Sequence, residues 1–213
     1  MKFSVITLFP ESLDSYRDSS MIKRATTRKL ISVQAVNPRD FCTDPHKKAD
    51  DKPYGGGPGM VMKAFPIVQA VNSLRLKKDT RRKILIMSPR GKQFTQKEAQ
   101  QYAKKYNELV LIAGHYEGID ARVKKILKAE EVSVGPYTLT GGELPALIII
   151  DAVSRHIPGV LGKTESLEEG RVTSGETYTR PEVLTYKGKK YRVPTVLLSG
   201  HHKNIDSYRS KKA

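Results

Sequence analysis

The sequence predicts an α/β fold in which helices cover a parallel β-sheet. Short runs rich in β-branched residues alternate along the chain with segments whose apolar residues have helical spacing. Such alternation is typical of strand–helix–strand units, which build parallel sheets covered by helices. The predicted strands are residues 3–9, 31–36, 83–88, 109–113 and 131–134.

Three helices are predicted between and after these strands. Residues 64–76 and 95–106 carry apolar residues at helical spacing. Thr95 and Glu98 fit a capping box, in which each side chain accepts a hydrogen bond from the other residue's backbone N–H. Residues 143–157 are apolar nearly all round, which predicts a helix that exposes little surface because it lies in the core or at a subunit interface.

The sequence becomes polar after this third helix. Residues 163–180 have no apolar periodicity and contain Gly170 and Gly175, a pattern typical of a linker or a lid loop. We therefore expect an α/β domain over residues 1–162, a flexible loop over 163–180 and a short basic segment over 181–213.

Positive charge is the main departure from ordinary composition. Lys and Arg number 38 against 22 Asp and Glu, so the formal net charge is +16. For a small soluble domain a magnitude of about 2–8 is ordinary. The basic residues cluster in residues 75–83 and 186–213, which favours a polyanionic partner over the alternative of a generally basic proteome.

Cysteine use and hydropathy restrict the compartment. Cys42 is the only cysteine, so an internal disulfide is excluded and a cytoplasmic setting is expected. No activating pattern surrounds Cys42, which argues against a nucleophile. The amino terminus lacks the features of a secretion signal, and the apolar stretch 144–153 is shorter than the roughly 20 residues of a membrane span. We expect a soluble protein.

The sequence lacks the common phosphate and zinc motifs. It has neither Gly-x-x-x-x-Gly-Lys-Ser/Thr nor Gly-x-Gly-x-x-Gly between a strand and a helix, which excludes the usual NTPase and dinucleotide sites. The glycine-dense residues 55–59 are interpreted as a tight loop, with phosphate binding as the alternative. The histidines lack zinc-ligand spacing. Asp50 and Asp51 could bind Mg²⁺, although such a pair more often caps a turn or forms a salt bridge.

Residues 133–145 are the most informative stretch. They place Gly135, Gly141 and Gly142, with two prolines and small hydroxyl residues, between an apolar strand and an apolar helix. Glycine has no Cβ and tolerates positive φ, so such a chain can wrap closely around a flat, polar ligand. We expect backbone groups of this loop to hold a small molecule.

Several short motifs occur in order along nearly the whole chain. They are Asn-Pro-Arg-Asp-Phe at 37–41, Asp-Asp-Lys-Pro-Tyr-Gly-Gly-Gly-Pro-Gly-Met at 50–60, Ser-Pro-Arg-Gly at 88–91, Gly-His-Tyr-Glu-Gly-Ile-Asp at 114–120, the loop at 133–145, Asp-Ala-Val-Ser-Arg at 151–155, Ile-Pro-Gly-Val-Leu-Gly at 157–162, Tyr-Thr-Arg-Pro-Glu-Val at 178–183 and Leu-Leu-Ser-Gly-His-His at 197–202. In this order they strongly resemble the bacterial tRNA (guanine-N1)-methyltransferases, a family of SPOUT enzymes.

The resemblance implies a deep trefoil knot in the C-terminal half of the domain, an exception to the rule against threaded connections. It implies an obligate homodimer with the active site between subunits, S-adenosyl-L-methionine as cofactor and tRNA as partner. The methyl group would go to N1 of the guanine at position 37, beside the anticodon, which maintains the reading frame. The alternatives are a catalytically weakened homologue that acts as a tRNA-binding module, and a SPOUT enzyme with a different target base.

By the same resemblance, the glycine-rich loop and two turns that follow strands enclose the cofactor. The expected cofactor-binding residues are Ser88, Pro89, Gly114, Tyr116, Glu117, Gly118, Ser133, Val134, Gly135, Pro136, Tyr137, Thr138, Leu139, Gly141, Gly142 and Pro145.

Guanine N1 carries a proton and is a poor nucleophile, so methyl transfer needs a base, and a cation near the neighbouring oxygen. The resemblance assigns the cation to Arg155; the alternative is a charge that complements the helix dipole. It assigns the base to Glu165, where the family has aspartate, with Glu168 and Glu169 nearby as substitutes. The extra methylene changes the reach of the carboxylate, which is expected to affect the rate more than the kind of chemistry.

The resemblance also gives expected substrate contacts, and the sequence departs from the family pattern at His115 and in its C-terminal segment. The resemblance places His46, Asp50, Arg155, Ser166 and His202 at the tRNA, and Mg²⁺ is an optional requirement for activity. His115 stands where the family has arginine, so a phosphate or substrate contact is expected to be weaker. The family continues beyond 197–202 into a helical tRNA-binding tail, which we expect to be short here. Either the basic run from Lys187 replaces part of it, or the chain is a truncated form.

Overall fold

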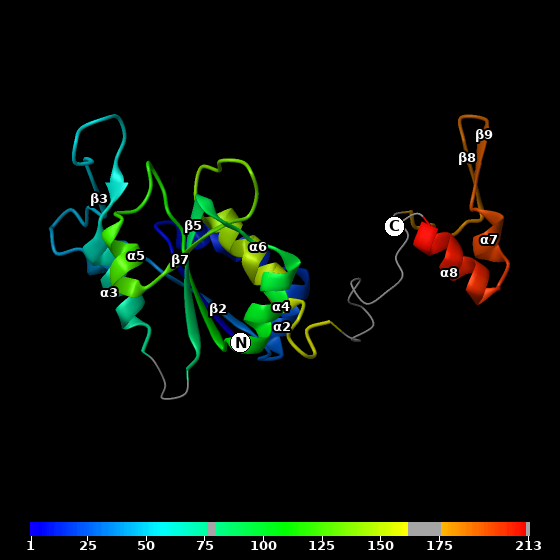
Figure 1. Cartoon of the computed structure of the whole chain (residues 1–213), viewed down its shortest axis with the longest axis horizontal. Coiled ribbons are helices and arrows are strands. Elements are labelled where there is room, and N and C mark those ends of the chain that lie inside the picture. The colour runs from blue at the N-terminus through cyan, green and yellow to red at the C-terminus, as the bar shows by residue number, and fades with distance from the viewer. Residues whose placement is uncertain (76–79, 162–175, 212–213) are drawn as a thin grey trace. The chain divides into compact units, whose positions relative to one another are not determined.

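The computed structural model describes residues 1–75, 80–161 and 176–211, and the chain divides into two compact units, Met1–Gly162 and Lys163–Ala213 (Figure 1). The first unit is built around a five-stranded sheet. Its strands are β1 (Lys2–Ile6), β2 (Ser32–Val36), β5 (Arg82–Gln93), β6 (Glu108–Ile112) and β7 (Glu130–Ser133), in the order β2-β1-β6-β5-β7. Every neighbouring pair is parallel, which confirms the predicted α/β class and its five strands.

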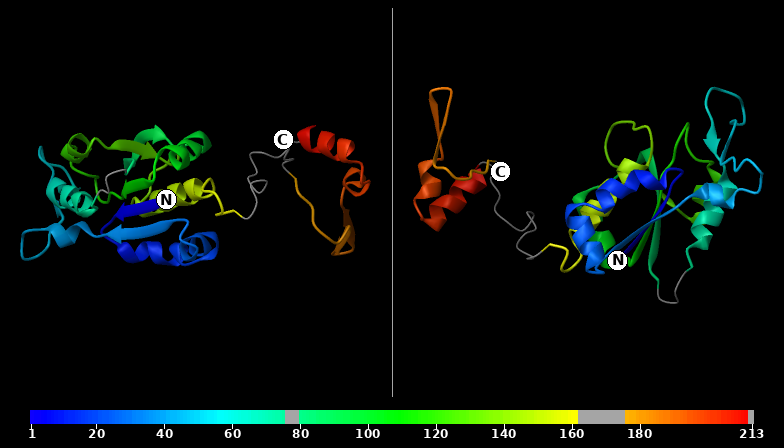
Figure 2. Two further views of the ribbon diagram at one scale, coloured as in Figure 1. Left: turned by 90° about the horizontal axis from the view of Figure 1, so that it is seen from below. Right: turned by 180° about the vertical axis from the view of Figure 1, so that it is seen from behind.

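Helices cover both faces of this sheet (Figures 1 and 2). One face packs against α2 (Ser20–Thr27), α4 (Gln96–Lys105) and α6 (Glu143–Ser154), and the other against α3 (Ala64–Ser73) and α5 (Arg122–Leu127). The connections contain η1 (Pro10–Leu13), α1 (Asp14–Arg17), η2 (Pro38–Phe41) and the antiparallel pair β3 (Asp50–Asp51) and β4 (Val61–Met62).

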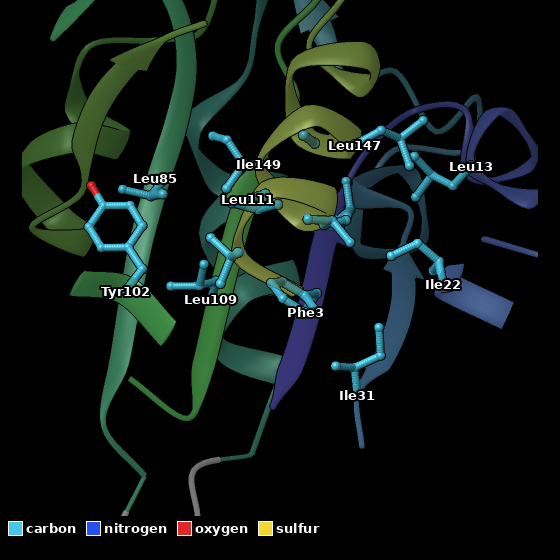
Figure 3. Close-up of a cluster of buried hydrophobic side chains, with 14 of the residues drawn as sticks. Phe3, Leu13, Ile22, Ile31, Leu85, Tyr102, Leu109, Leu111, Leu147 and Ile149 are labelled. Carbon is cyan, nitrogen blue, oxygen red and sulfur yellow. The ribbon is translucent and has the colours of Figure 1, made fainter. Parts of the chain in front are cut away.

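The strands supply alternate side chains to two cores. Phe3 of β1 and Leu109 of β6 lie in one core, and Ile6 and Val110 of the same strands lie in the other. Because successive strand residues point to opposite faces, a run that is apolar at every position fills both cores. Figure 3 shows the first core, where Ile149 of α6 lies among side chains of the central strands.

The predicted helices differ from the observed ones mainly at their ends. The capping box at the start of α4 is confirmed, since the side chains of Thr95 and Glu98 both accept the expected backbone hydrogen bonds. The third predicted helix, α6, leaves one face uncovered in the single chain, where Leu144 is 62% exposed and Ile148 is 43% exposed. Its core contacts cover only part of its circumference, so of the two expected settings the subunit interface remains a prediction for this face.

A buried carboxylate, Glu108, has several partners at the end of the sheet where the strands begin. Glu108 accepts a 2.7 Å hydrogen bond from Arg82 Nε and a 3.3 Å bond from Ser4 Oγ, and Lys2 Nζ lies 3.4 Å away. A buried carboxylate without such partners would strongly destabilise the fold. These contacts account for Glu108 as a structural residue at the amino-terminal ends of the strands.

The second unit is a basic hairpin followed by two helices. Strands β8 (Val183–Tyr186) and β9 (Lys189–Arg192) are antiparallel, and α7 (Thr195–Leu198) and α8 (His202–Lys211) follow. Lys187 and Gly188 both have positive φ, as a two-residue type I′ turn requires. All four residues of β9 are exposed. Much of the predicted lid, residues 163–175, lies outside the described residues. None of the helices among the described residues has the length and hydropathy needed to span a bilayer.

Candidate functional site

A cleft of about 950 Å³ lies beside the carboxyl ends of β6 and β7 and along the second half of β5. Ligands of α/β proteins commonly bind at this edge of a parallel sheet. The volume is within the range of sites for cofactor-sized organic molecules. Three turns form most of the wall: residues 86–90, 114–121 and 131–145. All of these residues line the cavity except Pro136, Glu143 and Leu144.

A bulge in β5 brings the first turn to the cleft. Met87 and Lys92 both pair with Val132 of β7, so the four residues between them leave the ladder. A Cβ on Gly91 would lie 2.4 Å from the Val132 backbone nitrogen, so no side chain fits there. Such bulges redirect neighbouring side chains, and here Ser88 and Pro89 line the cleft. The predicted strand end at Ser88 is wrong because β5 resumes after the bulge and continues to Gln93.

The glycines of the third turn, residues 131–145, allow close packing of backbone on backbone. A Cβ on Gly142 would lie 2.5 Å from Ala113 Cα and 2.8 Å from the Gly114 nitrogen. The Gly142 N–H donates a 2.9 Å hydrogen bond to the Gly114 carbonyl, which fastens the start of α6 to the end of β6. Gly135, Gly141 and Gly142 are not among the residues with positive φ. Of the two expected reasons for glycine, the missing Cβ therefore applies at these three positions and the left-handed backbone does not.

The glycine-dense loop 55–59 contacts the second turn of the wall, residues 114–121. Gly55, Gly56, Gly57 and Gly59 all have positive φ, which confirms a loop built on glycine conformations. A Cβ on Gly59 would lie 2.5 Å from the Glu117 side chain, and the Glu117 N–H donates to the Met60 carbonyl at 3.0 Å. This loop therefore supports the turn that carries Tyr116 and Glu117, which both line the cleft.

His115 takes part in a hydrogen-bond network that the sequence did not reveal. Its Nε2 lies 2.8 Å from Glu143 Oε2 and 2.9 Å from Oε1, and Thr7 Oγ1 also donates to Oε1. Thr7 and Glu143 are buried and far from His115 in sequence, so no local pattern points to this network. His115 itself lines the cleft.

The structure brings nearly all expected cofactor residues together. Every one of them except Pro136 lines the cleft. Charged residues that the sequence did not single out lie there too, among them Arg90, Asp120, Lys125 and Lys128. A hydrogen bond from Arg122 holds the pKa of Asp120 below its usual range, so this carboxylate adds negative charge at the rim.

Arg155, His46, Asp50 and His202, the expected catalytic and substrate residues that the structure describes, do not line this cleft. Arg155 follows the last turn of α6, and among the described residues its guanidinium has no hydrogen bond or ion pair. Glu165, Ser166, Glu168 and Glu169 lie outside the described residues.

The remaining expected tRNA contacts lie on other elements. His46 is exposed in the loop before β3, and its N–H donates to Asp44. Asp50 lies in β3 opposite Met62, whose N–H donates to the Gly118 carbonyl beside the cleft. His202 begins α8 in the second unit.

Two further candidates have structural explanations. Asp51 Oδ2 lies 3.6 Å from Lys63 Nζ, which supports the salt-bridge alternative for the acidic pair. The described residues contain no group of three or more side chains that could hold a metal ion. Burial raises the pKa of the Cys42 thiol, which opposes formation of a nucleophilic thiolate.

Comparison with known proteins gives a consistent family assignment. The family model described as "tRNA (Guanine-1)-methyltransferase TrmD" matches residues 1–213. A tRNA (guanine-N(1)-)-methyltransferase of Ruminiclostridium cellulolyticum is 46% identical over 217 residues, which cover 100% of this chain and 91% of the relative. Enzymes with the same name from Desulforamulus reducens and Carboxydothermus hydrogenoformans are 43% and 45% identical, and the matches cover 100% of this chain and 84% and 83% of those proteins.

Proposed function

The chain belongs to the tRNA (guanine-N1)-methyltransferase family and methylates N1 of guanine in tRNA, and from this premise we propose that its target is the guanine at position 37, beside the anticodon. A methyltransferase of this family uses S-adenosyl-L-methionine. The observation that carries the proposal is the cleft, whose walls come from the motifs that resemble the family's cofactor loops.

The cleft fits the cofactor in size and in the character of its walls. Its volume of about 950 Å³ suits a molecule that contains adenosine, and Gly135, Gly141 and Gly142 keep the wall free of side chains. We assign the adenosine part to the backbone of residues 133–142 and to the Ser88–Pro89 turn. When bound there, the cofactor supplies an activated methyl group.

The family relationship also leads us to propose a trefoil knot in this unit. It is supported by the path of the chain, which returns from β7, past β5, and packs Gly142 against the end of β6.

A homodimer is supported by one face of α6. Leu144, Ile148, Asp151 and Arg155 are spaced so that they share one face of a helix, and we call them the α6 stripe. Leu144 and Ile148 are large, apolar and exposed, and such residues favour a protein interface when they cluster. Tyr16 of α1, itself 43% exposed, interacts with Asp151 of the α6 stripe. A second copy seated here would bring Arg155 into the interface.

Two charged groups would act on the guanine. The Glu165 carboxylate would accept the N1 proton, so that the N1 lone pair can bond to the methyl carbon while the bond from that carbon to the cofactor sulfur breaks and S-adenosylhomocysteine is released. As the proton leaves, negative charge grows on guanine O6, and the Arg155 guanidinium donates hydrogen bonds to that oxygen. The absence of a competing acidic partner for Arg155 among the described residues leaves its donors free for this role.

The second unit would hold the tRNA backbone. Lys187, Lys189, Lys190 and Arg192 are exposed around the β8–β9 hairpin, and Lys187 Nζ lies 5.6 Å from the centre of the Tyr186 ring. Exposed cations beside an aromatic ring suit phosphates and unstacked bases. We propose that His202, His46, Asp50 and Ser166 also contact the tRNA. We further propose that Mg²⁺ activates the reaction and that the protein acts in the cytoplasm.

Replacing the proposed base is expected to slow the chemical step. Glu165→Gln should lower the single-turnover rate of methyl transfer by about 100-fold, the lower part of the range for a general base, because neighbouring carboxylates can partly substitute. Glu168→Gln and Glu169→Gln are the matched controls and should change the rate by less than about threefold. A large loss in either control with none in Glu165→Gln would move the base to that residue. Unchanged rates in all three would place the base outside this segment.

A further inference from the structure

We propose that His115 is a positioning residue for the cofactor, acting through Glu143 to hold the Gly141–Gly142 turn against the end of β6. The proposal rests on the proposed function, because it takes the cleft to be the site of S-adenosyl-L-methionine. It assigns a role to a residue that differs from the family's arginine.

The His115–Glu143 pair is well protected from water. The side chain of His115 is 18% exposed and that of Glu143 is 10% exposed. Both carboxylate oxygens lie within hydrogen-bond distance of Nε2, so this nitrogen carries the hydrogen that the carboxylate accepts. The Thr7 hydroxyl supplies a second donor to the same carboxylate. A carboxylate with two donors in a largely dry site is held in one orientation.

The imidazole also fixes its own backbone segment. The His115 ring packs edge-on against Phe9, with 4.8 Å between ring centres, and the His115 N–H points at Met62 Sδ at 3.3 Å. Phe9 and Thr7 follow β1, and Met62 lies in β4. His115 thus links the ends of β1 and β6 to Glu143, the first residue of α6, through its ring, and contacts β4 through its backbone N–H.

The glycine turn is shaped around this pair. A Cβ on Gly141 would lie 2.5 Å from His115 Cε1 and 2.6 Å from Glu143 Oε2. The backbone of Gly141 therefore lies directly on the pair, and Gly142 beside it bonds to Gly114. Both glycines line the cleft, so a shift of the pair would move the cofactor wall itself.

The same geometry opposes a direct role for His115 at a tRNA phosphate. Its Nε2 is already committed to the Glu143 carboxylate, and a negative neighbour disfavours an incoming phosphate. We expected a weaker phosphate contact from His115 than from the family's arginine. We now propose that His115 contacts Glu143 inside the protein and no phosphate. Loss of His115 should weaken binding of the cofactor and leave binding of tRNA nearly unchanged.

The test measures the dissociation constant of S-adenosylhomocysteine by calorimetry on the full chain. His115→Leu should raise it by about 10- to 100-fold, the range for a hydrogen bond to a charged group. His115→Arg restores N–H donors to the carboxylate and should return the constant to within about threefold of the unmodified protein. Glu143→Gln keeps the shape, removes the charge and should weaken binding by about 10-fold. His201→Leu, on an exposed histidine of the second unit, is the matched control and should have no effect.

A double variant tests whether His115 and Glu143 affect cofactor binding through the hydrogen bond between them or independently. His115→Leu combined with Glu143→Gln should bind no more weakly than the weaker single variant, because either change alone breaks the bond. The KM for tRNA should stay within about threefold in every variant that binds cofactor. Additive losses, failure of His115→Arg to restore binding, or a changed KM for tRNA with unchanged cofactor affinity would overturn the proposal. If His115→Leu does not fold, the affinity of Glu143→Gln for S-adenosylhomocysteine tests the proposal, and an unchanged affinity would overturn it. Failure of the unmodified protein to bind S-adenosylhomocysteine would instead contradict the proposed function.

Discussion

Gly142→Ala is expected to weaken cofactor binding by about 100-fold, near the upper end of the 1–3 kcal/mol that a methyl group forced into a packed site typically costs, because here the methyl group would meet main chain. The new Cβ would lie 2.5 Å from Ala113 Cα and 2.9 Å from the Ala113 carbonyl carbon. These are backbone atoms at the end of a fully buried central strand, so they cannot rotate aside as a side chain can. The start of α6 must then move away from β6, and the cleft loses one wall.

Calorimetry with S-adenosylhomocysteine measures this effect, and thermal unfolding shows that the variant is folded. Gly200→Ala is the control, because a Cβ there meets no atom within 4 Å although φ is +70°. It should leave the cofactor dissociation constant within about threefold. A Gly142→Ala protein that bound the cofactor like the unmodified protein would contradict the placement of the site.

Arg155→Ala is expected to lower the rate of the chemical step by about 100- to 1000-fold, as loss of one preorganised donor to a developing oxyanion does. Affinity for the cofactor should stay within about threefold, because Arg155 does not line the cleft of its own chain. Single-turnover methyl transfer gives the rate, and calorimetry gives the affinity.

Two variants make the Arg155 result specific. Arg155→Lys keeps the charge and loses the planar fork, so it should recover only part of the rate. Arg24→Ala removes an exposed arginine of α2 and should leave the rate unchanged. An unchanged rate in Arg155→Ala would remove this residue from the mechanism. A loss confined to cofactor affinity would instead make it part of the cofactor site.

The sequence predicted the elements of the fold because their signals are local. Alternation of apolar runs located all five strands of the sheet, and the Thr95 and Glu98 pattern located the start of α4. The bulge in β5 was missed because it depends on pairing with Val132, which no local pattern encodes. The sequence left open whether the core or a second subunit covers Leu144 and Ile148, because an apolar helix has the same pattern in both settings.

The candidate site was predicted in part. Motif resemblance selected residues that the fold gathers around one cleft, although most of them are distant from one another in sequence. The His115–Glu143–Thr7 network was not predicted, since its members come from separate segments and each has an ordinary local environment. The sequence also did not show why position 142 is glycine. The structure explains it, because a Cβ there would meet the backbone of Ala113 and Gly114 after β6.

The most direct test of the central claim is methyl transfer from labelled S-adenosylmethionine to an unmodified tRNA with guanines at positions 36 and 37, beside the same tRNA with position 37 changed. Transfer to the first tRNA alone, recovered as 1-methylguanosine, is the predicted result. Equal transfer to both would contradict position 37 as the target and favour a different target base. No transfer to either, with cofactor and tRNA both bound, would contradict catalysis and leave a tRNA-binding module.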